Sequence, residues 1–265
     1  MSLLITGATL ADGTRGDLYV ADGRLADPAS APAGVERIDA DGLLALPGLV
    51  DLHTHLRQPG REDAETVASG TAAAACGGYT CVHAMANTNP VTDTAEAAEY
   101  IHSLGGSDGH CEVRVVGAVT KGLAGEELAE LGLMHASAAG VTVFSDDGRC
   151  VDDSLLMRRA LSYVKAFDGV VAQHSQDPRL AGPGACCHES EWSGRLGLPG
   201  WPAQAESVIV ARDVQLAELT DSRVHVCHVS TAESVDVVRW AKKRGIKVTA
   251  AATPHHLRLD TPLAA

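Results

Sequence analysis

The sequence is poor in the residues that bind nucleic acid. It has only nine aromatic residues, two Phe, three Trp and four Tyr, and no block rich in Lys or Arg. Its net charge is −13, from 21 basic and 34 acidic residues. Because nucleic-acid binding relies on basic patches and aromatic stacking, we do not expect this class of function. An acidic protein of this kind binds an anionic ligand only through a local cation.

The sequence also lacks the signs of a disulfide framework, a secretion signal or a membrane span. Its seven cysteines are an odd number without zinc-ribbon spacing, and the adjacent Cys186 and Cys187 are expected to be reduced thiols. The first seven residues have no basic region followed by a long apolar one. No apolar run approaches the ~18 residues that span a bilayer. We therefore expect a soluble, cytoplasmic protein that does not contact membranes.

Residues 1–47 predict a small β module. Short apolar runs at 3–5, 18–20 and 35–38 are separated by three Asp-Gly pairs, namely Asp12-Gly13, Asp22-Gly23 and Asp41-Gly42. Asp-Gly between short apolar runs is a hairpin signal.

Residues 48–265 instead alternate between expected strands and helices. We expect strands at 48–53, 80–85, 112–118, 141–144, 170–174, 223–228 and 246–250. Expected amphipathic helices include 153–167, 203–219 and 231–244, the last with a capping box at Ser230-Thr231-Ala232-Glu233. This alternation predicts an α/β fold with a parallel sheet, doubly wound or closed as a (β/α)8 TIM-type barrel. Seven strands are found where a closed barrel has eight. No Gly-rich phosphate loop follows the first strand, which disfavours nucleotide binding.

The most informative segment is residues 49–57, Leu-Val-Asp-Leu-His-Thr-His-Leu-Arg, at the end of the first expected barrel strand. Side chains alternate between the two faces of a strand, so Asp51, His53 and His55 share one face. Same-face neighbours lie roughly 6.5 Å apart, close enough for two imidazoles to bind one metal ion. Arg57 continues the series just beyond the strand, where a fixed cation can hold an anionic group.

Polar residues recur at the C-terminal ends of the other expected strands, the face on which barrel active sites are built. The second strand runs into residues 85–90, Met-Ala-Asn-Thr-Asn-Pro, and the fourth ends in residues 144–148, Phe-Ser-Asp-Asp-Gly. The fifth strand ends in His174 and the sixth in His228. Nitrogen and oxygen donors without thiolate suit Zn²⁺ with open positions for water. Cys227 faces away from His228 by alternation and is interpreted as structural.

These motifs, together with Pro254-His255-His256-Leu257, resemble the dihydroorotases of the amidohydrolase superfamily. The resemblance is to the class in which an aspartate, rather than a carbamylated lysine, bridges the metals. It covers essentially the whole chain in order. It implies a small β module at 1–47 and an amidohydrolase barrel at 48–265 that is incomplete at its C-terminal end.

The resemblance also implies a set of site residues. One or two zinc ions would be held by the ligands His53, His55, Asp147, His174 and His228. The residue types alone leave the choice between Asp146 and Asp147 open, and the resemblance assigns the bridging role to Asp147. Arg57 and Asn87 match residues that bind the substrate carboxylate. The other histidines are expected to be structural or exposed, among them His83, His102, His110, His135, His188 and His225.

The implied activity is the interconversion of N-carbamoyl-L-aspartate and L-dihydroorotate in de novo pyrimidine synthesis. Hydrolysis of a cyclic amide needs a nucleophile at neutral pH, and a metal ion lowers the pKa of bound water to about 7. A planar, bidentate arginine suits the carboxylate of the small anionic substrate. A homodimer and an aspartate transcarbamoylase partner are both compatible with the resemblance.

The chain departs from the family in two places. The family's eighth strand carries an aspartate that ligates a metal and shuttles a proton, in a Thr-Asp-His-Ala-Pro-His-like motif that does not occur within residues 1–265. We therefore expect no catalytic acid–base residue in this chain, interpret it as truncated before the last barrel strand, and expect it to be inactive alone. Ala251 stands where relatives typically have a glutamate. Nothing in the sequence explains it.

Two other functions remain open. A cyclic amidohydrolase of the allantoinase or hydantoinase type usually carries a carbamylated lysine at the end of the fourth strand, where this chain has Asp146-Asp147. A non-catalytic, dihydroorotase-like scaffold of aspartate transcarbamoylase tends to lack the first His-x-His pair, which is present here. Stoichiometric zinc would distinguish an enzyme from a scaffold.

Overall fold

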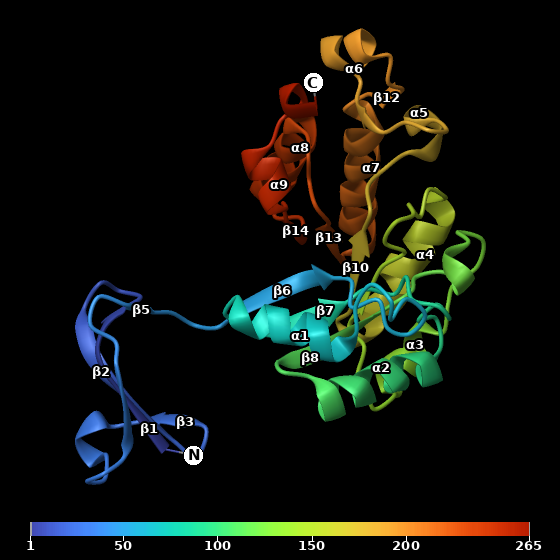
Figure 1. Ribbon diagram of the computed structural model, residues 1–265. Helices are drawn as coiled ribbons and strands as arrows, with labels where there is room; N and C mark the ends of the chain where they lie inside the picture. The colour runs from blue at the N-terminus through green and yellow to red at the C-terminus, as the bar shows by residue number, and fades with distance from the viewer. Residues whose placement is uncertain (1, 265) are drawn as a thin grey trace. The chain divides into compact units, whose positions relative to one another are not determined.

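The structure, a computed structural model, describes residues 2–264 (Figure 1). The chain divides into two compact units, Met1–Leu49 and Val50–Ala265. None of the helices in the described part of the chain is long and apolar enough to cross a membrane.

The first unit is a five-stranded sheet built around its first strand. Its elements are β1 (Ser2–Leu10), β2 (Arg15–Ala21), β3 (Arg24–Ala26), η1 (Pro28–Ser30), β4 (Glu36–Asp39) and β5 (Leu44–Ala45). The turns at Asp12-Gly13 and Asp22-Gly23 close antiparallel hairpins, as expected. The turn at Asp41-Gly42 does not, because β4 and β5 both pair parallel to β1. That hairpin expectation was wrong.

The second unit contains a curled sheet in the order β14-β13-β10-β9-β8-β7-β6. Its strands are β6 (Leu49–Thr54), β7 (Tyr79–Ala84), β8 (Glu112–Gly117), β9 (Val143–Phe144), β10 (Val170–Gln173), β13 (Arg223–Val226) and β14 (Val248–Ala250). From β7 to β14 every neighbouring pair is parallel. The sheet order follows the chain order, as in a barrel, and all seven expected strands are present.

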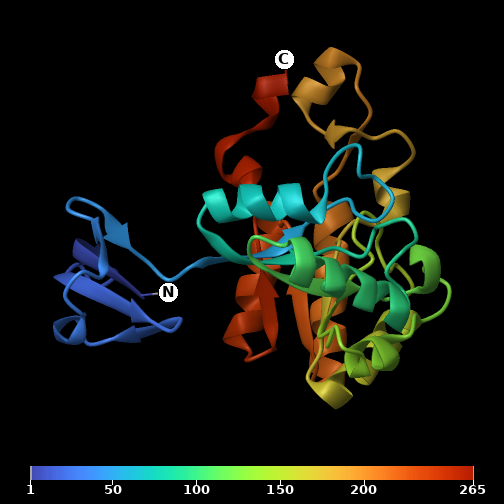
Figure 2. The ribbon, with the colours of Figure 1, turned by 60° about the horizontal axis from the view of Figure 1, so that its bottom comes forward.

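Helices connect the strands and pack along the curled sheet (Figures 1 and 2). The longer helices are α1 (Val67–Cys76), α2 (Ala95–Asp108), α4 (Ser154–Val164), α7 (Gln204–Thr220) and α8 (Ala232–Lys243). The shorter ones are η2 (Lys121–Leu123), α3 (Leu131–Ala136), η3 (Lys165–Phe167), α9 (Pro254–Arg258) and η4 (Thr261–Ala264). Side chains from strands and helices form one apolar core, which includes the buried residues Val82, Val115, Phe144, Val171 and Val226 from the strands and Met157, Leu161, Val210 and Val214 from α4 and α7.

Strand β9 is shorter than the expected 141–144. Its pairing nevertheless continues at both ends, through hydrogen bonds from Val170 N to Thr142 O (2.8 Å) and from Ser145 N to Gly117 O (2.8 Å).

The first strand of the second unit, β6, is less buried than its apolar composition predicts, with Val50 and Leu52 about half exposed. In the described sheet β6 is an outermost strand, so no described strand pairs with its other side.

Helix α8 begins one residue later than the capping box predicts. Its N-cap is Thr231, whose Oγ1 accepts a hydrogen bond from Ser234 N (3.3 Å). The Ser230 hydroxyl instead donates to Glu206 of α7 (2.5 Å), while Glu233 lies exposed. The capping-box expectation was wrong because a carboxylate distant in the sequence takes the donors of Ser230.

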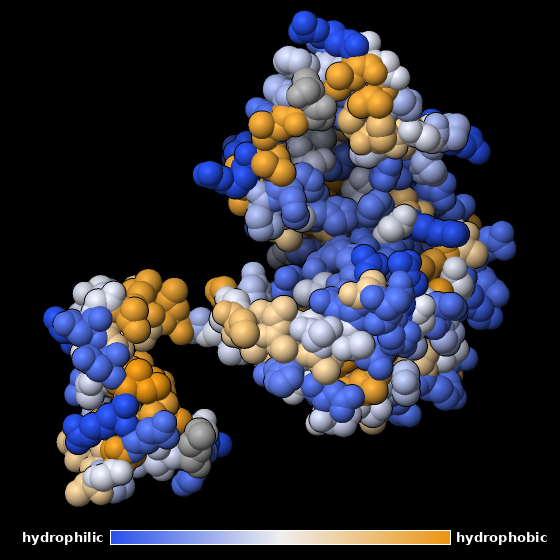
Figure 3. All heavy atoms as spheres, viewed as in Figure 1, coloured by the Kyte–Doolittle hydropathy of each residue, from blue (hydrophilic) through white to orange (hydrophobic). Residues whose placement is uncertain are grey.

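Between β10 and α7 the chain forms an extra segment. It contains α5 (Pro178–Ala181), β11 (Cys187–His188), α6 (Glu191–Leu196) and β12 (Gly200–Trp201), and β11 pairs parallel to β12. Figure 3 shows apolar side chains gathered over α6 and α9 on an otherwise mostly hydrophilic face of this unit. The large exposed apolar residues there are Leu196, Leu198, Leu257, Leu259 and Leu263.

Candidate metal centre

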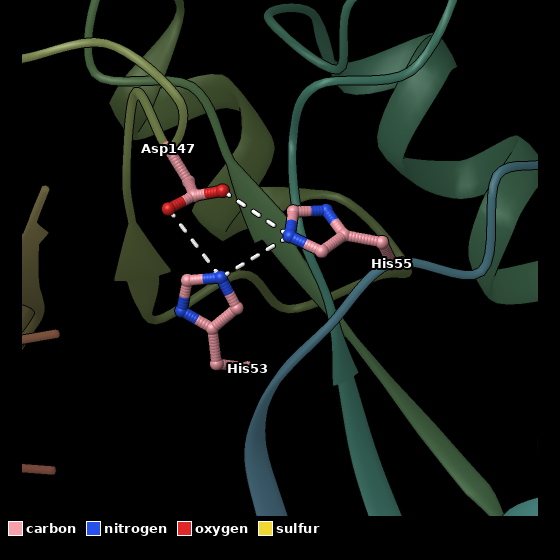
Figure 4. Close-up of side chains that lie close together, drawn as sticks. All are labelled: His53, His55 and Asp147. Carbon is pink, nitrogen blue, oxygen red and sulfur yellow. Dashed lines mark hydrogen bonds and ion pairs between the residues drawn. The ribbon is translucent and has the colours of Figure 1, made fainter. Parts of the chain in front are cut away.

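The first pair of predicted ligands lies at the end of β6. His53 is within the strand and His55 follows its last residue, so alternation places both imidazoles on one side. Their Nε2 atoms are 3.3 Å apart, and each lies 3.3 Å from a carboxylate oxygen of Asp147 (Figure 4). The two histidines therefore lie together on one side of the strand, as the alternation of side chains predicted. Asp51 is not in this group, because its side chain accepts a hydrogen bond from the His53 amide (3.0 Å).

The second pair comes from the ends of β10 and β13. His174 Nδ1 lies 3.1 Å from His228 Nε2. Both atoms approach Asp147 Oδ1, at 3.5 Å and 3.3 Å. Asp147 thus lies between two histidine pairs, and all five predicted ligands meet in one cluster.

The structure distinguishes the two adjacent aspartates. Asp146 faces the segment after β8, where its Oδ1 accepts hydrogen bonds from the amides of Val119 (2.7 Å) and Thr120 (3.0 Å) and its Oδ2 accepts one from the Thr120 hydroxyl. These contacts hold the backbone beside the next residue, Asp147, whose side chain contacts the histidines instead. Asp146 is therefore a structural residue, and Asp147 is the one available to a metal.

Electrostatics favour an ionised Asp147. Burial acts to raise the pKa of its carboxyl, but hydrogen bonds from His174, His228 and His53 outweigh burial and lower the pKa well below its ordinary value. Asp147 is 6% exposed, whereas the four imidazoles are 21–27% exposed. An ionised carboxylate under four partly accessible imidazoles is an electron-rich donor set.

The donor separations fit a metal ion. Tetrahedral zinc at about 2.0–2.1 Å from nitrogen and oxygen places its ligand atoms roughly 3.3–3.4 Å apart. The separations within the cluster are 3.1–3.5 Å. Among the described residues, two groups could each hold an ion, one of His53, His55 and Asp147 and the other of Asp147, His174 and His228. The residues present therefore fit a metal centre in which Asp147 is shared.

The two predicted substrate-binding residues lie beside the first pair. Asn87 Oδ1 is 3.0 Å from His55 Nδ1, so Nδ1–H donates to the amide and His55 Nε2 is left to face Asp147. Arg57 is exposed, with a left-handed backbone (φ 58°), and its guanidinium makes no hydrogen bond or ion pair that is seen among residues 2–264. A free cation thus lies two residues beyond His55.

Sequence reasoning missed the residues that hold the second pair. Gln176 Oε1 is 2.9 Å from His174 Nε2. The two residues are two positions apart, as His53 and His55 are, and this spacing could have indicated the contact. Glu206 holds Ser230 and Thr231, just after His228. No local pattern marks this residue, because its partners are 24 and 25 positions away.

Helix α7 also holds the segment that follows Asp147. The Arg212 guanidinium donates to the carbonyl oxygens of Asp152 (2.6 Å) and Val151 (2.7 Å), and the side chain of Gln173 bonds both backbone groups of Val151 (3.1 Å and 3.2 Å). Arg212 pairs with the fully buried Asp213 (2.7 Å). Burial raises the pKa of Asp213 to about 6, although Arg212 acts to lower it.

Three of the remaining histidines make contacts within the fold, and Cys227 is buried. His83 Nδ1 bonds Asp51 O (3.2 Å), His225 Nδ1 bonds Thr249 Oγ1 (2.8 Å), and His135 stacks on Phe167 at 4.3 Å between ring centroids. Cys227 is buried, and burial raises the pKa of its thiol to about 12. All seven cysteines are free thiols.

Comparison with solved structures identifies the class of fold. The chain superimposes on L-hydantoinase from Arthrobacter aurescens with a TM-score of 0.82 at 22% identity, covering 99% of this chain and 60% of that one. Dihydropyrimidinase from Brevibacillus agri gives a TM-score of 0.79 at 21% identity, covering 98% of this chain and 59% of that one. The fold is therefore a TIM-type barrel with an N-terminal β module, as in these enzymes, which confirms the predicted fold class.

Comparison of sequences identifies the family within that class. Residues 42–234 match the model of the dihydro-orotase-like family. Proteins named dihydroorotase are 63% identical in Leifsonia xyli subsp. xyli and 52% identical in Mycobacterium tuberculosis, over 99% and 98% of this chain and 60% and 61% of theirs. The chain belongs to the dihydroorotase-like family, as the motifs predicted. It spans about 60% of the length of these relatives. Family and cluster together indicate a metal-binding site.

Proposed function

We propose that the protein is a zinc-dependent dihydroorotase that interconverts N-carbamoyl-L-aspartate and L-dihydroorotate in pyrimidine synthesis. The observation that carries the proposal is the position of Asp147 between two histidine pairs, in a chain of the dihydroorotase-like family. We further propose that residues 1–47 form the small β module and residues 48–265 the barrel part of the enzyme.

The proposed ligands divide into two sets that share one carboxylate. His53 and His55 would hold one ion, His174 and His228 the other, and Asp147 would contribute an oxygen to each. Nitrogen and oxygen donors without thiolate suit zinc. When bound, zinc supplies a Lewis acid that makes water nucleophilic near neutral pH and polarises a carbonyl.

The chain's own side chains would orient the substrate. The side-chain oxygen of Asn87 accepts a hydrogen bond from His55. Its NH2 group can therefore donate to a carboxylate. Arg57 can add two parallel N–H donors to the same anion, because its guanidinium is not engaged by a described acidic residue. Asn87 contacts His55 and Arg57 follows it by two residues, so a bound carboxylate would lie beside the first histidine pair.

Elemental analysis and activity together test this proposal. In full-length protein that includes the family's eighth strand, the wild type should contain zinc and hydrolyse dihydroorotate. His174→Ala and His228→Ala should lower both the zinc content and the rate. The exposed residue His102 on α2 provides the control, since His102→Ala should change neither. Equal zinc content in all four proteins would refute the ligand assignment.

Substrate choice tests the particular activity. The solved structures with this fold include hydantoinases, but at identities that establish the fold alone. A protein that hydrolyses hydantoin faster than dihydroorotate would contradict the proposal. Zinc-free protein without turnover would instead favour the scaffold function. Association with aspartate transcarbamoylase, homodimerisation and a cytoplasmic location stay predictions.

A further inference from the structure

His228 has an unusual backbone conformation. Its φ is 36°, in the left-handed region that residues with a side chain rarely adopt. Strand β13 ends at Val226, so His228 lies on a loop and is not held by the strand's own ladder. A strained conformation persists only where the surroundings determine it. The contacts of the following residues should therefore show what holds His228 in place.

Glu206 of α7 makes five hydrogen bonds to the two residues that follow this loop position. Its Oε1 accepts from the amides of Ser230 (3.2 Å) and Thr231 (3.2 Å) and from the Thr231 hydroxyl (2.9 Å). Its Oε2 accepts from the Ser230 amide (3.0 Å) and the Ser230 hydroxyl (2.5 Å). The amides and hydroxyls of both residues therefore lie within hydrogen-bond distance of one carboxylate, although the Thr231 hydroxyl can instead donate to Ser234 Oγ (2.8 Å).

Nothing else described competes for this carboxylate. Glu206 is 9% exposed, and no Lys or Arg forms an ion pair with it among residues 2–264. Its charge is balanced by amides and hydroxyls at the N-terminus of the 12-residue helix α8, where the helix dipole also favours an anion. A buried carboxylate without a cationic partner is costly unless it is fully hydrogen-bonded, so its geometry is strongly fixed.

The same turn of α7 also holds the segment after His174. The carbonyl oxygen of Ala205, adjacent to Glu206, accepts a hydrogen bond from Asp177 N (2.7 Å). One turn of helix thus holds the chain after both histidines of the second pair. Contacts on other sides of the loop come from backbone groups, Cys227 N to Gln173 O (3.1 Å) and Val229 N to Ala251 O (2.7 Å).

We propose that Glu206 is a positioning residue that holds His228 in its left-handed conformation through Ser230 and Thr231, and so sets the geometry of the second histidine pair. Glu206 is not a ligand and not a catalytic residue, because it acts through the loop and does not touch the cluster. The proposal rests on the proposed metal site. Its consequence is that the second ion should depend on Glu206 far more than the first.

The test compares metal affinity in three proteins. Glu206→Gln keeps the shape but removes the charge and one acceptor oxygen. Glu218→Gln is the matched control, because Glu218 is on the same helix and its side chain pairs with an exposed arginine, Arg244 (2.6 Å). Zinc affinity is measured by competition with a chelator, and the visible spectrum of cobalt-substituted protein reports each site's geometry. A purely structural role would lower thermal stability without changing the spectrum.

We expect Glu206→Gln to weaken one of the two zinc sites by about tenfold to a hundredfold, the range for residues that support metal ligands. The other site and the Glu218→Gln protein should stay within about twofold of wild type. Two zinc affinities within twofold of wild type in Glu206→Gln, with an unchanged cobalt spectrum, would overturn the proposal.

A milder variant covers the case in which Glu206→Gln does not fold. Ser230→Ala removes only the hydroxyl that donates to Oε2, and should weaken the same single site by a smaller factor. Where both variants fold, Ser230→Ala should have less effect in the Glu206→Gln background than in wild type. Additive effects, or loss at the first site instead, would contradict the proposal.

Metal-free protein separates this inference from the proposed function. If wild type binds no zinc, the proposed function fails, but the loop can still be observed by amide hydrogen exchange. Protection of the Ser230 and Thr231 amides should fall in Glu206→Gln and not in Glu218→Gln. Unchanged protection of both amides would show that Glu206 does not hold the loop.

Discussion

Asp146 and Asp147 are neighbours in the sequence with different partners, so their substitutions should have different effects. In Asp146→Ala the amides of Val119 and Thr120 lose their acceptor, Asp146 Oδ1, in a region where both residues are fully buried. Leaving a buried donor unsatisfied costs about 1–3 kcal/mol, so two amides give about 2–6 kcal/mol. We expect Asp146→Ala to lower the free energy of unfolding by about 3–5 kcal/mol, near the middle of that range.

Asp146→Asn provides an internal check on this magnitude. The asparagine oxygen can still accept from both amides, and its NH2 group can donate to the Thr120 hydroxyl. Burial raises the pKa of Asp146, so a neutral side chain is tolerated there. We expect this variant to lose only about 1 kcal/mol, the net value of one ordinary hydrogen bond.

Urea unfolding in the presence of a chelator measures these differences without a metal contribution. Asp147→Ala leaves the Val119 and Thr120 contacts intact, so its metal-free protein should be much closer to wild type in stability than Asp146→Ala is. Purified without chelator, Asp147→Ala should lose zinc, whereas Asp146→Asn should retain it. If Asp146→Ala and Asp147→Ala lost the same stability and the same zinc, the assignment of structural and ligand roles would be refuted.

Three further predictions follow from the site and its surroundings. In the full-length protein, Arg57→Lys should keep its zinc but lower kcat/KM for dihydroorotate by roughly tenfold to a hundredfold, because a charge-assisted hydrogen bond is lost. Arg61→Lys, at an exposed arginine paired with Asp63, is the control, and equal kinetics in both variants would contradict the role of Arg57. The pKa of Asp213 is raised from 3.8 to about 6 in the folded state, so the folded protein holds this proton more tightly than the unfolded chain does. The free energy of unfolding should therefore fall as pH rises from about 4 to 6, by up to about 3 kcal/mol. Asp213→Asn should remove most of this dependence, measured by urea unfolding across that range, and an identical pH profile would show that Asp213 is ionised throughout. Unfolded without reductant, the protein should titrate seven thiols, and two fewer would indicate a bond between Cys186 and Cys187.

The sequence was most informative where the chemistry is local. The alternation at His53 and His55 and the strand-end positions of His174 and His228 were sufficient to predict that these side chains meet, because parallel strands present their carboxyl ends at one edge. The choice of Asp147 over Asp146 required the family resemblance. Residue type and spacing are the same for both, and only the contact of Asp146 with the segment after β8 separates them.

Contacts between distant segments could not be predicted in this way. The Ser230-x-x-Glu233 spacing predicts a local capping box. In the structure the Ser230 hydroxyl instead donates a hydrogen bond to Glu206, which belongs to another helix. The Asp41-Gly42 turn has the composition of a hairpin, but the pairing of β4 and β5 with β1 decides their direction. In both places a tertiary partner overrides a local preference.

Helix α7 holds two loops of the site, and it also fixes the distance between the two side chains that hold them. Glu206 holds the loop that carries His228, and Arg212, six residues later, holds the segment after Asp147. At 1.5 Å per residue these two anchors are about 9 Å apart along the axis, and a helix keeps that separation constant. The Asp147 carboxylate and the His228 imidazole, 3.3 Å apart, thus belong to two segments that are held at fixed points of one helix. A one-residue insertion between positions 206 and 212 would rotate one anchor by about 100° relative to the other, so both loops could no longer be held at once.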